Sequence, residues 1–421
     1  MKRIVLSLTL LSLAIPAFAE WPEFRGPNQD GTTDAENLPT EWSEEKNVSW
    51  KTPIHGLGWS TPLISEGKIW LTTATEDGRE MSILCVDEAS GEILLDRVFI
   101  TNDNPEPLAN PMNTYASPTG VVEKGHAYFH FGSYGTFCLD TESYEMLWQR
   151  RDLTCSHWRG PASSLAMWED KVILTMEGAD QQYFVALNKE TGETIWRRDR
   201  STNYDDEKEG IPANSGDMRK AYSTPIFVPV GDVVQMISNG AKAAWAYNVE
   251  NGEEIWSAHY ATHSPSSRSI YSKKEGMVYI NTGLGKAEIW AIKLDPKAKG
   301  EISETHLAWN YIKRTPKRSS PVLANGLIFM ANDGVISCVD AKTGEAKWTE
   351  RGGHEYSASL LSDGNVVYFF DEEGLCTVTK AGAEFEVVSE NHLDDGLMAS
   401  PAVSGDALIL RTKTHLYRVA K

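Results

Sequence analysis

Basic and aromatic residues recur shortly before a repeated Ser/Thr-Pro element, and their side chains have the chemistry to hold a ligand. Arginine and lysine bind carboxylate or sulfate groups, and tryptophan and tyrosine offer flat faces on which a sugar or another ring stacks. The candidate ligand-binding residues are Trp59, Asn113, Tyr115, His157, Trp158, Arg159, Arg219, Lys220, Tyr222, Arg268, Lys317, Arg318, His354 and Tyr356. We expect them to line a funnel that accepts an anionic or polyhydroxylated ligand.

A structural role explains the same residues equally well. The basic side chains would then pair with acidic loops, and the aromatic ones would fill the space where the loops meet. Both interpretations require that the segments converge in the fold.

Signatures of catalysis are scarce in this sequence. It contains no nucleophile elbow, no His-Glu-x-x-His zinc motif and no glycine-rich phosphate loop. Asp394 and Asp395 are weak candidates for a cation site, because adjacent acids are usually just solvated. We assign no catalytic residue and expect a binding protein rather than an enzyme.

A sequence repeat must bring the candidate ligand-binding residues together in the fold. Its clearest copy spans residues 319–348. Ser319-Ser320-Pro321 opens a first strand, residues 326–330 and 336–340 form two more, and residues 343–348 lead through Thr-Gly to a fourth strand with a tryptophan. The side chain of an Asp or Asn before the turn can form hydrogen bonds with the backbone of the turn, and the glycine adopts the positive φ that the turn requires. The tryptophan offers a large face for packing against a neighbouring unit.

The short Ser- and Thr-rich element that starts the first strand of this repeat, which we call the opener, recurs through the chain. The openers lie at residues 60–62, 117–118, 163–164, 223–225, 268–269, 319–321, 357–359 and 400–401. A four-stranded unit at this period is a propeller blade. We therefore predict an all-β fold, an eight-bladed β-propeller of four-stranded blades, as a single domain over residues 20–421. The last copy lacks its fourth strand, so we expect residues 48–51 to complete the eighth blade and close the ring.

The pattern Asp/Asn-x-x-Thr-Gly-x-x-x-Trp resembles the repeats of pyrroloquinoline quinone (PQQ) enzymes and covers nearly all of residues 20–421. That family includes PQQ-dependent alcohol and sugar dehydrogenases and a BamB-like group, named for a lipoprotein of the outer-membrane β-barrel assembly machinery. The length and the single ring look more like the BamB-like group, and this resemblance implies a protein partner. Residues 21–27 also look like the start of secreted PQQ-like propellers.

Departures from the dehydrogenase pattern argue against the cofactor. PQQ dehydrogenases have adjacent cysteines and a Glu, Asn and Asp set for calcium, and neither is found here. We expect no cofactor and a monomer that binds a protein or a small anionic or carbohydrate ligand. The alternatives are a PQQ- and calcium-dependent oxidoreductase of alcohols or sugars, and a carbohydrate-binding propeller without turnover.

The ends and the charge of the chain predict its location. Met1-Lys2-Arg3, an apolar run and Ala17-Phe18-Ala19 are typical of a signal peptide over residues 1–19. We expect cleavage near Ala19 and a periplasmic or secreted protein. Glu20 is not a cysteine, so no lipid anchor is expected, and no later segment looks like a membrane span. The net charge of −19 would repel nucleic acid.

Three longer insertions separate repeats, and their roles are not predicted by the sequence. The first, residues 101–114, is rich in Asn and Pro, and the second, residues 201–221, is highly charged. The third, residues 296–306, is rich in Lys and Glu. Long loops in a compact fold are often functional, although solvated decoration is the simpler interpretation of the third.

The cysteines are predicted to be free. Cys85, Cys138, Cys338 and Cys376 fall at one repeat position, where other copies have alanine. Matching positions of neighbouring blades should lie roughly 10 Å apart, too far for a disulfide. Thiol titration of the unfolded, unreduced protein should detect all 5 cysteines. A lower count would show a disulfide and contradict this interpretation.

Overall fold

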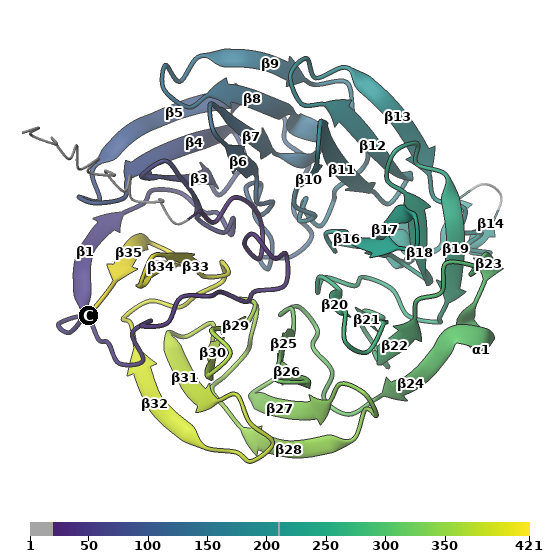
Figure 1. The fold of residues 1–421 in the computed structure, drawn as a ribbon. Helices are drawn as coiled ribbons and strands as arrows, with labels where there is room; N and C mark the ends of the chain where they lie inside the picture. The colour runs from purple at the N-terminus through teal and green to yellow at the C-terminus, as the bar shows by residue number, and fades with distance from the viewer. Residues whose placement is uncertain (1–19, 209–210) are drawn as a thin grey trace, which may run out of the picture.

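Eight antiparallel sheets form a ring around a central channel, which confirms the predicted propeller (Figure 1). The computed structural model describes residues 20–208 and 211–421. The predicted signal peptide, residues 1–19, lies outside the described residues. None of the described helices has the length and apolar character needed to cross a membrane.

Each blade runs from an inner strand at the channel to an outer strand at the rim. The first four blades contain β2 (Leu63–Ser65), β3 (Lys68–Ala74), β4 (Glu80–Asp87) and β5 (Ile93–Thr101); β6 (Val121–Glu123), β7 (His126–His130), β8 (Thr136–Asp140) and β9 (Met146–Arg150); β10 (Ala166–Trp168), β11 (Lys171–Glu177), β12 (Gln182–Asn188) and β13 (Thr194–Asp199); and β16 (Ile226–Val230), β17 (Val233–Asn239), β18 (Ala243–Asn248) and β19 (Glu254–His259).

The remaining blades follow the same order. They contain β20 (Ile270–Ser272), β21 (Met277–Asn281), β22 (Ile289–Lys293) and β24 (Leu307–Tyr311); β25 (Val322–Ala324), β26 (Leu327–Asn332), β27 (Val335–Asp340) and β28 (Ala346–Arg351); β29 (Leu361–Ser362), β30 (Val366–Phe370), β31 (Leu375–Lys380) and β32 (Val387–His392); and β33 (Ala402–Ser404), β34 (Ala407–Arg411), β35 (His415–Val419) and β1 (Val48–Pro53).

The ring closes through the predicted displaced strand. β1 pairs antiparallel with β35, with Val48 opposite Val419 and Pro53 opposite His415. The eighth blade therefore joins residues from both ends of the described chain. This pairing satisfies an outer edge of the last blade that would otherwise be open.

Tryptophans of the outer strands dock each blade on the next. The Trp148 indole N–H donates to the Lys189 carbonyl across 2.8 Å, and its ring covers Gly192 in the turn of the following blade. Trp50, Trp196, Trp309 and Trp348 likewise donate to backbone carbonyls of the next blade. The repeated Trp and Gly are thus the two halves of one contact between blades.

A ring of hydroxyl groups links the blades at the channel. It is formed by residues that stand two positions before an inner strand, namely Thr61, Thr119, Ser164, Thr224, Ser320, Ser359 and Ser400. The Thr61 N–H donates to Thr119 Oγ1 across 2.9 Å, and the Thr119 N–H donates to Ser164 Oγ across 3.0 Å. We call this set the hydroxyl ring. In the fifth blade, Arg268 occupies the equivalent position.

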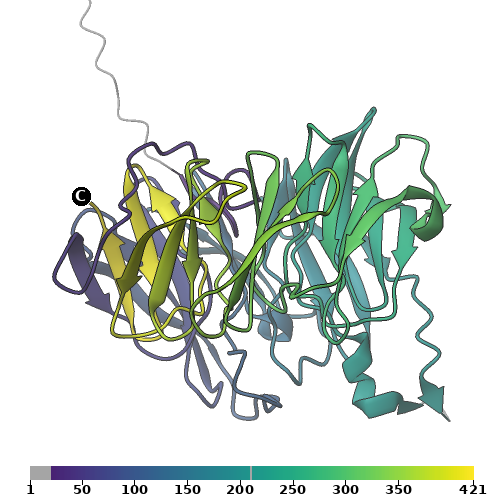
Figure 2. The ribbon, with the colours of Figure 1, turned by 90° about the horizontal axis from the view of Figure 1, so that it is seen from below.

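The first two insertions and the N-terminal segment lie on opposite faces of the ring (Figure 2). The segment from Trp21 to Gly31 crosses one mouth of the channel and bonds to several blades. The second insertion forms β14 (Glu207–Lys208), β15 (Ile211–Pro212) and the 3-10 helix η2 (Ala213–Arg219) on the other face, while η1 (Gly132–Tyr134) is a short turn between strands.

The third insertion adds a strand to a blade. β23 (Gly300–Glu301) pairs parallel with β19, and α1 (Ser303–His306) follows it. This contact covers the outer edge of the fourth blade.

All five cysteines are free and buried, as predicted. The predicted equivalence of Cys376 is wrong, however. Cys85, Cys138 and Cys338 each stand immediately before a β-bulge of the third strand. In β31 the bulge follows Val378, so that residue occupies the shared position and Cys376 lies two residues earlier.

The docking contact predicts unequal effects for two glycines of one blade. Gly344 has a φ of +73°, and a Cβ there would lie 2.7 Å from the Trp309 ring, whereas Gly326 has a φ of +77° and faces open space. Gly326→Ala should cost about 1 kcal/mol for the left-handed backbone alone. Gly344→Ala should cost about 1–3 kcal/mol more, because it overpacks the contact. Urea unfolding compares the two, and equal losses would contradict the docking role.

Candidate functional site

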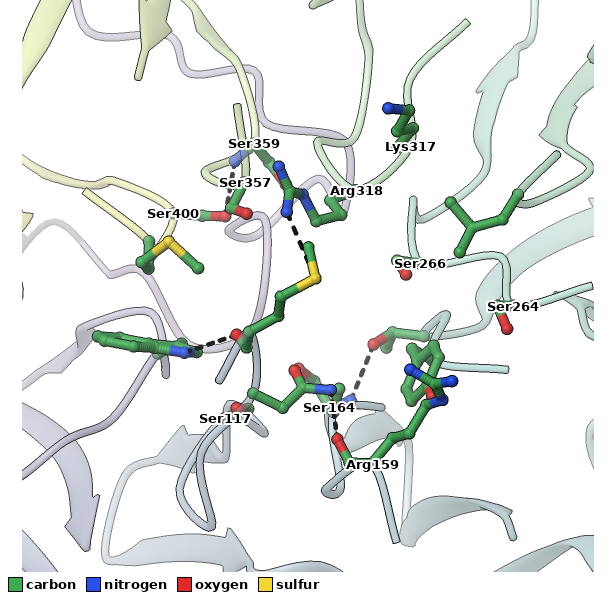
Figure 3. Close-up of a pocket in the computed structure, with 18 of the residues that line it drawn as sticks. Ser117, Arg159, Ser164, Ser264, Ser266, Lys317, Arg318, Ser357, Ser359 and Ser400 are labelled. Carbon is green, nitrogen blue, oxygen red and sulfur yellow. Dashed lines mark hydrogen bonds between the residues drawn. The ribbon is translucent and has the colours of Figure 1, made fainter. Parts of the chain in front are cut away.

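A pocket of about 360 Å³ opens at the mouth of the channel opposite the N-terminal segment (Figure 3). The first two insertions contribute Met112, Asn113 and Asp217 to its wall, and Phe24 of the N-terminal segment closes its inner end. Of the predicted ligand-binding residues, those in this wall are Trp59, Asn113, Arg159, Tyr222, Lys317 and Arg318. We call this cavity the mouth pocket.

The first insertion fixes the aromatic side of the mouth pocket. The Trp59 indole N–H donates to the Met112 carbonyl across 3.0 Å. The Asn113 side-chain amide donates to the Arg159 carbonyl across 2.9 Å. The insertion thus orders the indole, which keeps part of its surface exposed beside the cavity.

The cations of the wall are all engaged in ion pairs. Arg159 holds Asp217 with two hydrogen bonds, one of them 2.9 Å between Nη2 and Oδ2. Arg318 bonds to Glu355 at 2.6 Å and lies 2.9 Å from Glu372, and Lys317 pairs with Asp333. The rim therefore follows the structural interpretation, in which basic side chains pair with acidic loops.

Arg268 does not line the mouth pocket, and its expected place in the funnel needs correction. Its side chain is fully buried and lies 3.2 Å from the Glu23 carboxylate. It also donates to the Pro225 carbonyl across 2.8 Å and to the Phe24 carbonyl. Burial raises the pKa of Glu23, and the Arg268 charge opposes that shift. Arg268 thus anchors the N-terminal segment across the channel.

Other candidates point into the protein. Lys220 is completely buried and donates to the Glu177 carbonyl across 3.1 Å. The Tyr115 and Tyr356 hydroxyls bond to backbone within their own loops. His157 is buried with its Nε2 atom 3.2 Å from Cys155 Sγ. Burial raises the pKa of Cys155 to about 12, so the thiol stays neutral.

The last candidates lie outside the pocket wall. Arg219 pairs with Asp206 and Glu207 inside the second insertion. His354 pairs with Asp371 beside the seventh blade. Trp158 packs under the Arg159 guanidinium, whose central carbon is 4.7 Å from the indole centroid. Sequence position places these residues near an opener but does not fix the direction of their side chains.

Among the residues that the structure describes, the weak metal candidates do not form a cluster with other ligands. Asp395 accepts a hydrogen bond from the Thr414 hydroxyl, and Asp394 is exposed. In the described part of the chain, Glu123, His126 and Glu190 do come together. Their site already contains a cation, because Lys189 Nζ lies 2.9 Å from Glu123.

The sequence reasoning missed the hydroxyl ring as part of the site. Its members Thr119, Ser164, Thr224, Ser359 and Ser400 lie at the inner end of the mouth pocket. The repeated Ser/Thr of the openers is the available signal, but in the sequence alone it indicates only the start of a strand. Figure 3 shows serines from several blades facing one opening.

Two further buried arginines stand close to the hydroxyl ring. Arg25 donates to the Leu360 and Ser320 carbonyls at 2.9 and 3.2 Å, with the charge of Asp30 nearby. Arg411 donates to Ser60 Oγ across 2.8 Å. Burial lowers the pKa of each arginine to about 9, so both remain protonated at neutral pH.

The buried Arg268 and the partly exposed Arg159 should differ in how much they contribute to the free energy of unfolding. Arg268→Met leaves the buried Glu23 without its cation and should cost about 3–5 kcal/mol of unfolding free energy. Arg159→Met breaks a partly exposed pair and should cost about 1 kcal/mol or less. Denaturant unfolding of both variants measures the difference. Similar losses would show that Arg268 is not a buried anchor.

Comparisons with known proteins agree with this fold. A family model described as outer membrane protein assembly factor BamB matches residues 137–385, which is more than half of the chain. No curated protein matches the chain. BamB from Moraxella catarrhalis aligns with a TM-score of 0.59 at 10% identity, over 88% of this chain and 99% of that one.

Two dehydrogenases are similar in structure as well. Quinohemoprotein alcohol dehydrogenase from Comamonas testosteroni aligns with a TM-score of 0.61 at 13% identity, over 96% of this chain and 81% of that one. A europium-containing methanol dehydrogenase aligns with a TM-score of 0.63 at 10% identity, over 94% of this chain and 88% of that one. These likenesses concern the fold alone, whereas the family match covers the repeats themselves: the chain belongs to the family of the outer membrane protein assembly factor BamB.

Proposed function

We propose that the chain is an exported, non-enzymatic propeller that binds a small ligand in the mouth pocket and acts as a binding scaffold. The proposal rests on the kinds of side chain that form the wall of that pocket. Trp59 and Tyr222 provide aromatic surface beside serine and threonine hydroxyls, within a volume of about 360 Å³. Small-molecule sites have this size and this mixture of apolar surface with few polar groups. A polyhydroxylated ligand such as a sugar fits both kinds of group.

PQQ does not fit the residues of the mouth pocket. PQQ carries several carboxylates and sits beside calcium, so it needs free cations and free acids in its site. Here Arg159 and Arg318 are already paired, and so are the acids Asp217 and Glu355. The chain also has no adjacent cysteines. We therefore derive no chemistry through a quinone.

An envelope location follows from the same proposal. The basic and apolar start of the chain favours export, and the family description names an outer-membrane assembly factor. A periplasmic or secreted propeller with one open mouth could meet ligands that diffuse in the envelope.

A protein partner is the second candidate, and exposed apolar side chains favour it. Ile93 and Leu94 on β5, Met146 and Leu147 on β9, and Ile195 on β13 are all exposed. They occupy the outer strands of three consecutive blades, so a partner that spans these strands would bury them, as protein interfaces bury exposed apolar side chains. Co-purification from the native envelope would test for such a partner.

Ligand binding at the mouth pocket can be tested with a tryptophan pair. A glycan and small-ligand screen by fluorescence should find a ligand, and Trp59→Ala should weaken its binding about tenfold or more. Loss of aromatic contact worth about 1.5 kcal/mol corresponds to that factor. Trp168→Ala is the matched control, because Trp168 is also partly exposed but lies outside the pocket wall.

Two results would contradict the proposal. Equal binding by both variants would place the ligand elsewhere on the molecule. Saturable binding of PQQ with calcium, together with dye-linked oxidation of an alcohol or sugar, would favour the dehydrogenase alternative.

A further inference from the structure

The hydroxyls at the floor of the mouth pocket have protons to donate. Thr119, Ser164, Thr224, Ser359 and Ser400 line this floor and are each 7% exposed or less. Each oxygen accepts a hydrogen bond from a backbone N–H of the preceding blade, over 2.9–3.2 Å. A hydroxyl has one proton in addition to its acceptor sites.

No group in the described part of the chain accepts these protons. The neighbouring serines of the rim differ in this respect, since Ser357 donates to Glu372 across 2.6 Å and Ser117 donates to the Thr114 carbonyl. Because the backbone bonds fix the oxygens, the floor presents a partial ring of preorganised O–H donors. Such a ring favours a guest that only accepts hydrogen bonds.

The charge beside the floor has the matching sign. Arg411 is buried next to the hydroxyl ring, and its guanidinium bonds to Ser60, the residue before Thr61. Its buried environment lowers its pKa without any acidic group opposing the shift. Glu23 and Asp30, the acids on the other side of the floor, face Arg268 and Arg25. Among the described residues no carboxylate forms an ion pair with Arg411, so its positive charge beside the hydroxyl ring is unbalanced there.

The floor is closed on its far side. Phe24 lies at the inner end of the mouth pocket, and the segment around it is anchored by Arg268 and by the bonds from Arg25 to the sixth and seventh blades. A guest could reach the hydroxyls only from the open mouth and would be shielded from solvent. Shielding strengthens hydrogen bonds to a charged acceptor.

We propose that the floor of the mouth pocket binds a single oxyanion, either a free sulfate or the carboxylate of a larger ligand, through the hydroxyl protons of Thr119 and Ser164, which lie on neighbouring blades and are linked by a 3.0 Å hydrogen bond from the Thr119 N–H to Ser164 Oγ. The inference rests on the proposed function, because it names the chemical group that the ligand buries. The paired rim above the floor would then contact the neutral remainder of the ligand.

Calorimetric titration with sulfate, glucuronate and glucose tests this assignment. Glucuronate and glucose share a sugar ring and differ in the carboxylate. We expect glucuronate to bind at least tenfold more tightly than glucose, because hydrogen bonds to a charged group are worth about 1.5–3 kcal/mol. Sulfate should compete with glucuronate for the same site.

Matched variants assign the binding to the floor. Thr119→Val removes the hydroxyl at nearly constant shape and should weaken glucuronate about tenfold, while Thr119→Ser keeps the proton and should preserve binding. If Thr119→Val does not fold, Arg411→Gln tests the charge, with Arg411→Lys as its control. Ser143→Ala changes an exposed serine in the turn between β8 and β9, outside the pocket wall, and should have no effect.

The outcomes separate this inference from the proposed function. Equal binding of glucose and glucuronate would overturn the oxyanion site and leave ligand binding intact. Glucuronate binding that Thr119→Val and Arg411→Gln do not change would overturn it as well. Absence of binding by both sulfate and glucuronate would also refute the oxyanion site. The proposed function would then still be tested separately, by comparing ligand binding of the Trp59→Ala and Trp168→Ala variants.

Discussion

The inner strands of the propeller are held together by side-chain hydroxyls that accept backbone hydrogen bonds from the preceding blade. The backbone N–H groups of Thr61, Thr119 and Ser164 donate to the hydroxyls of Thr119, Ser164 and Thr224, respectively. In the later blades, the N–H groups of Arg268, Ser320 and Ser359 donate in the same way to the hydroxyls of Ser320, Ser359 and Ser400. These bonds satisfy buried N–H groups and fix the spacing of blades at the channel. The same oxygens line the floor of the mouth pocket, and no described residue accepts their protons, so one interaction supports both the fold and the site.

Interruption of the hydroxyl ring in the fifth blade has its own structural consequence. Arg268 stands where the other blades have Ser or Thr, and its guanidinium reaches the N-terminal segment instead of a neighbouring backbone N–H. That segment closes one mouth of the channel, and Phe24 becomes the inner end of the pocket. Together with Arg25 and the backbone bonds of the segment, Arg268 thereby helps to hold the residues that close this end of the channel.

The fold was predictable from the sequence because each blade repeats its own local chemistry. The Asp340 side chain bonds the turn at Thr343, Gly344 takes a positive φ, and Trp309 of the preceding blade covers that glycine. The site was only partly predictable. Trp59 and Arg159 were identified by type and position, but Arg268 and Lys220 have the same type and comparable positions and point inward. Only tertiary packing decides those directions, and the ion pairs that neutralise the rim come from residues distant in sequence.

The account depends most on the free hydroxyl protons at the floor of the mouth pocket. A crystal soaked in selenate, whose selenium stands in for the sulfur of sulfate, would locate an oxyanion by anomalous scattering. We predict a peak that places selenate oxygens within hydrogen-bonding distance of the Thr119 and Ser164 hydroxyls. A peak confined to surface lysines, or no peak in the pocket, would contradict the account.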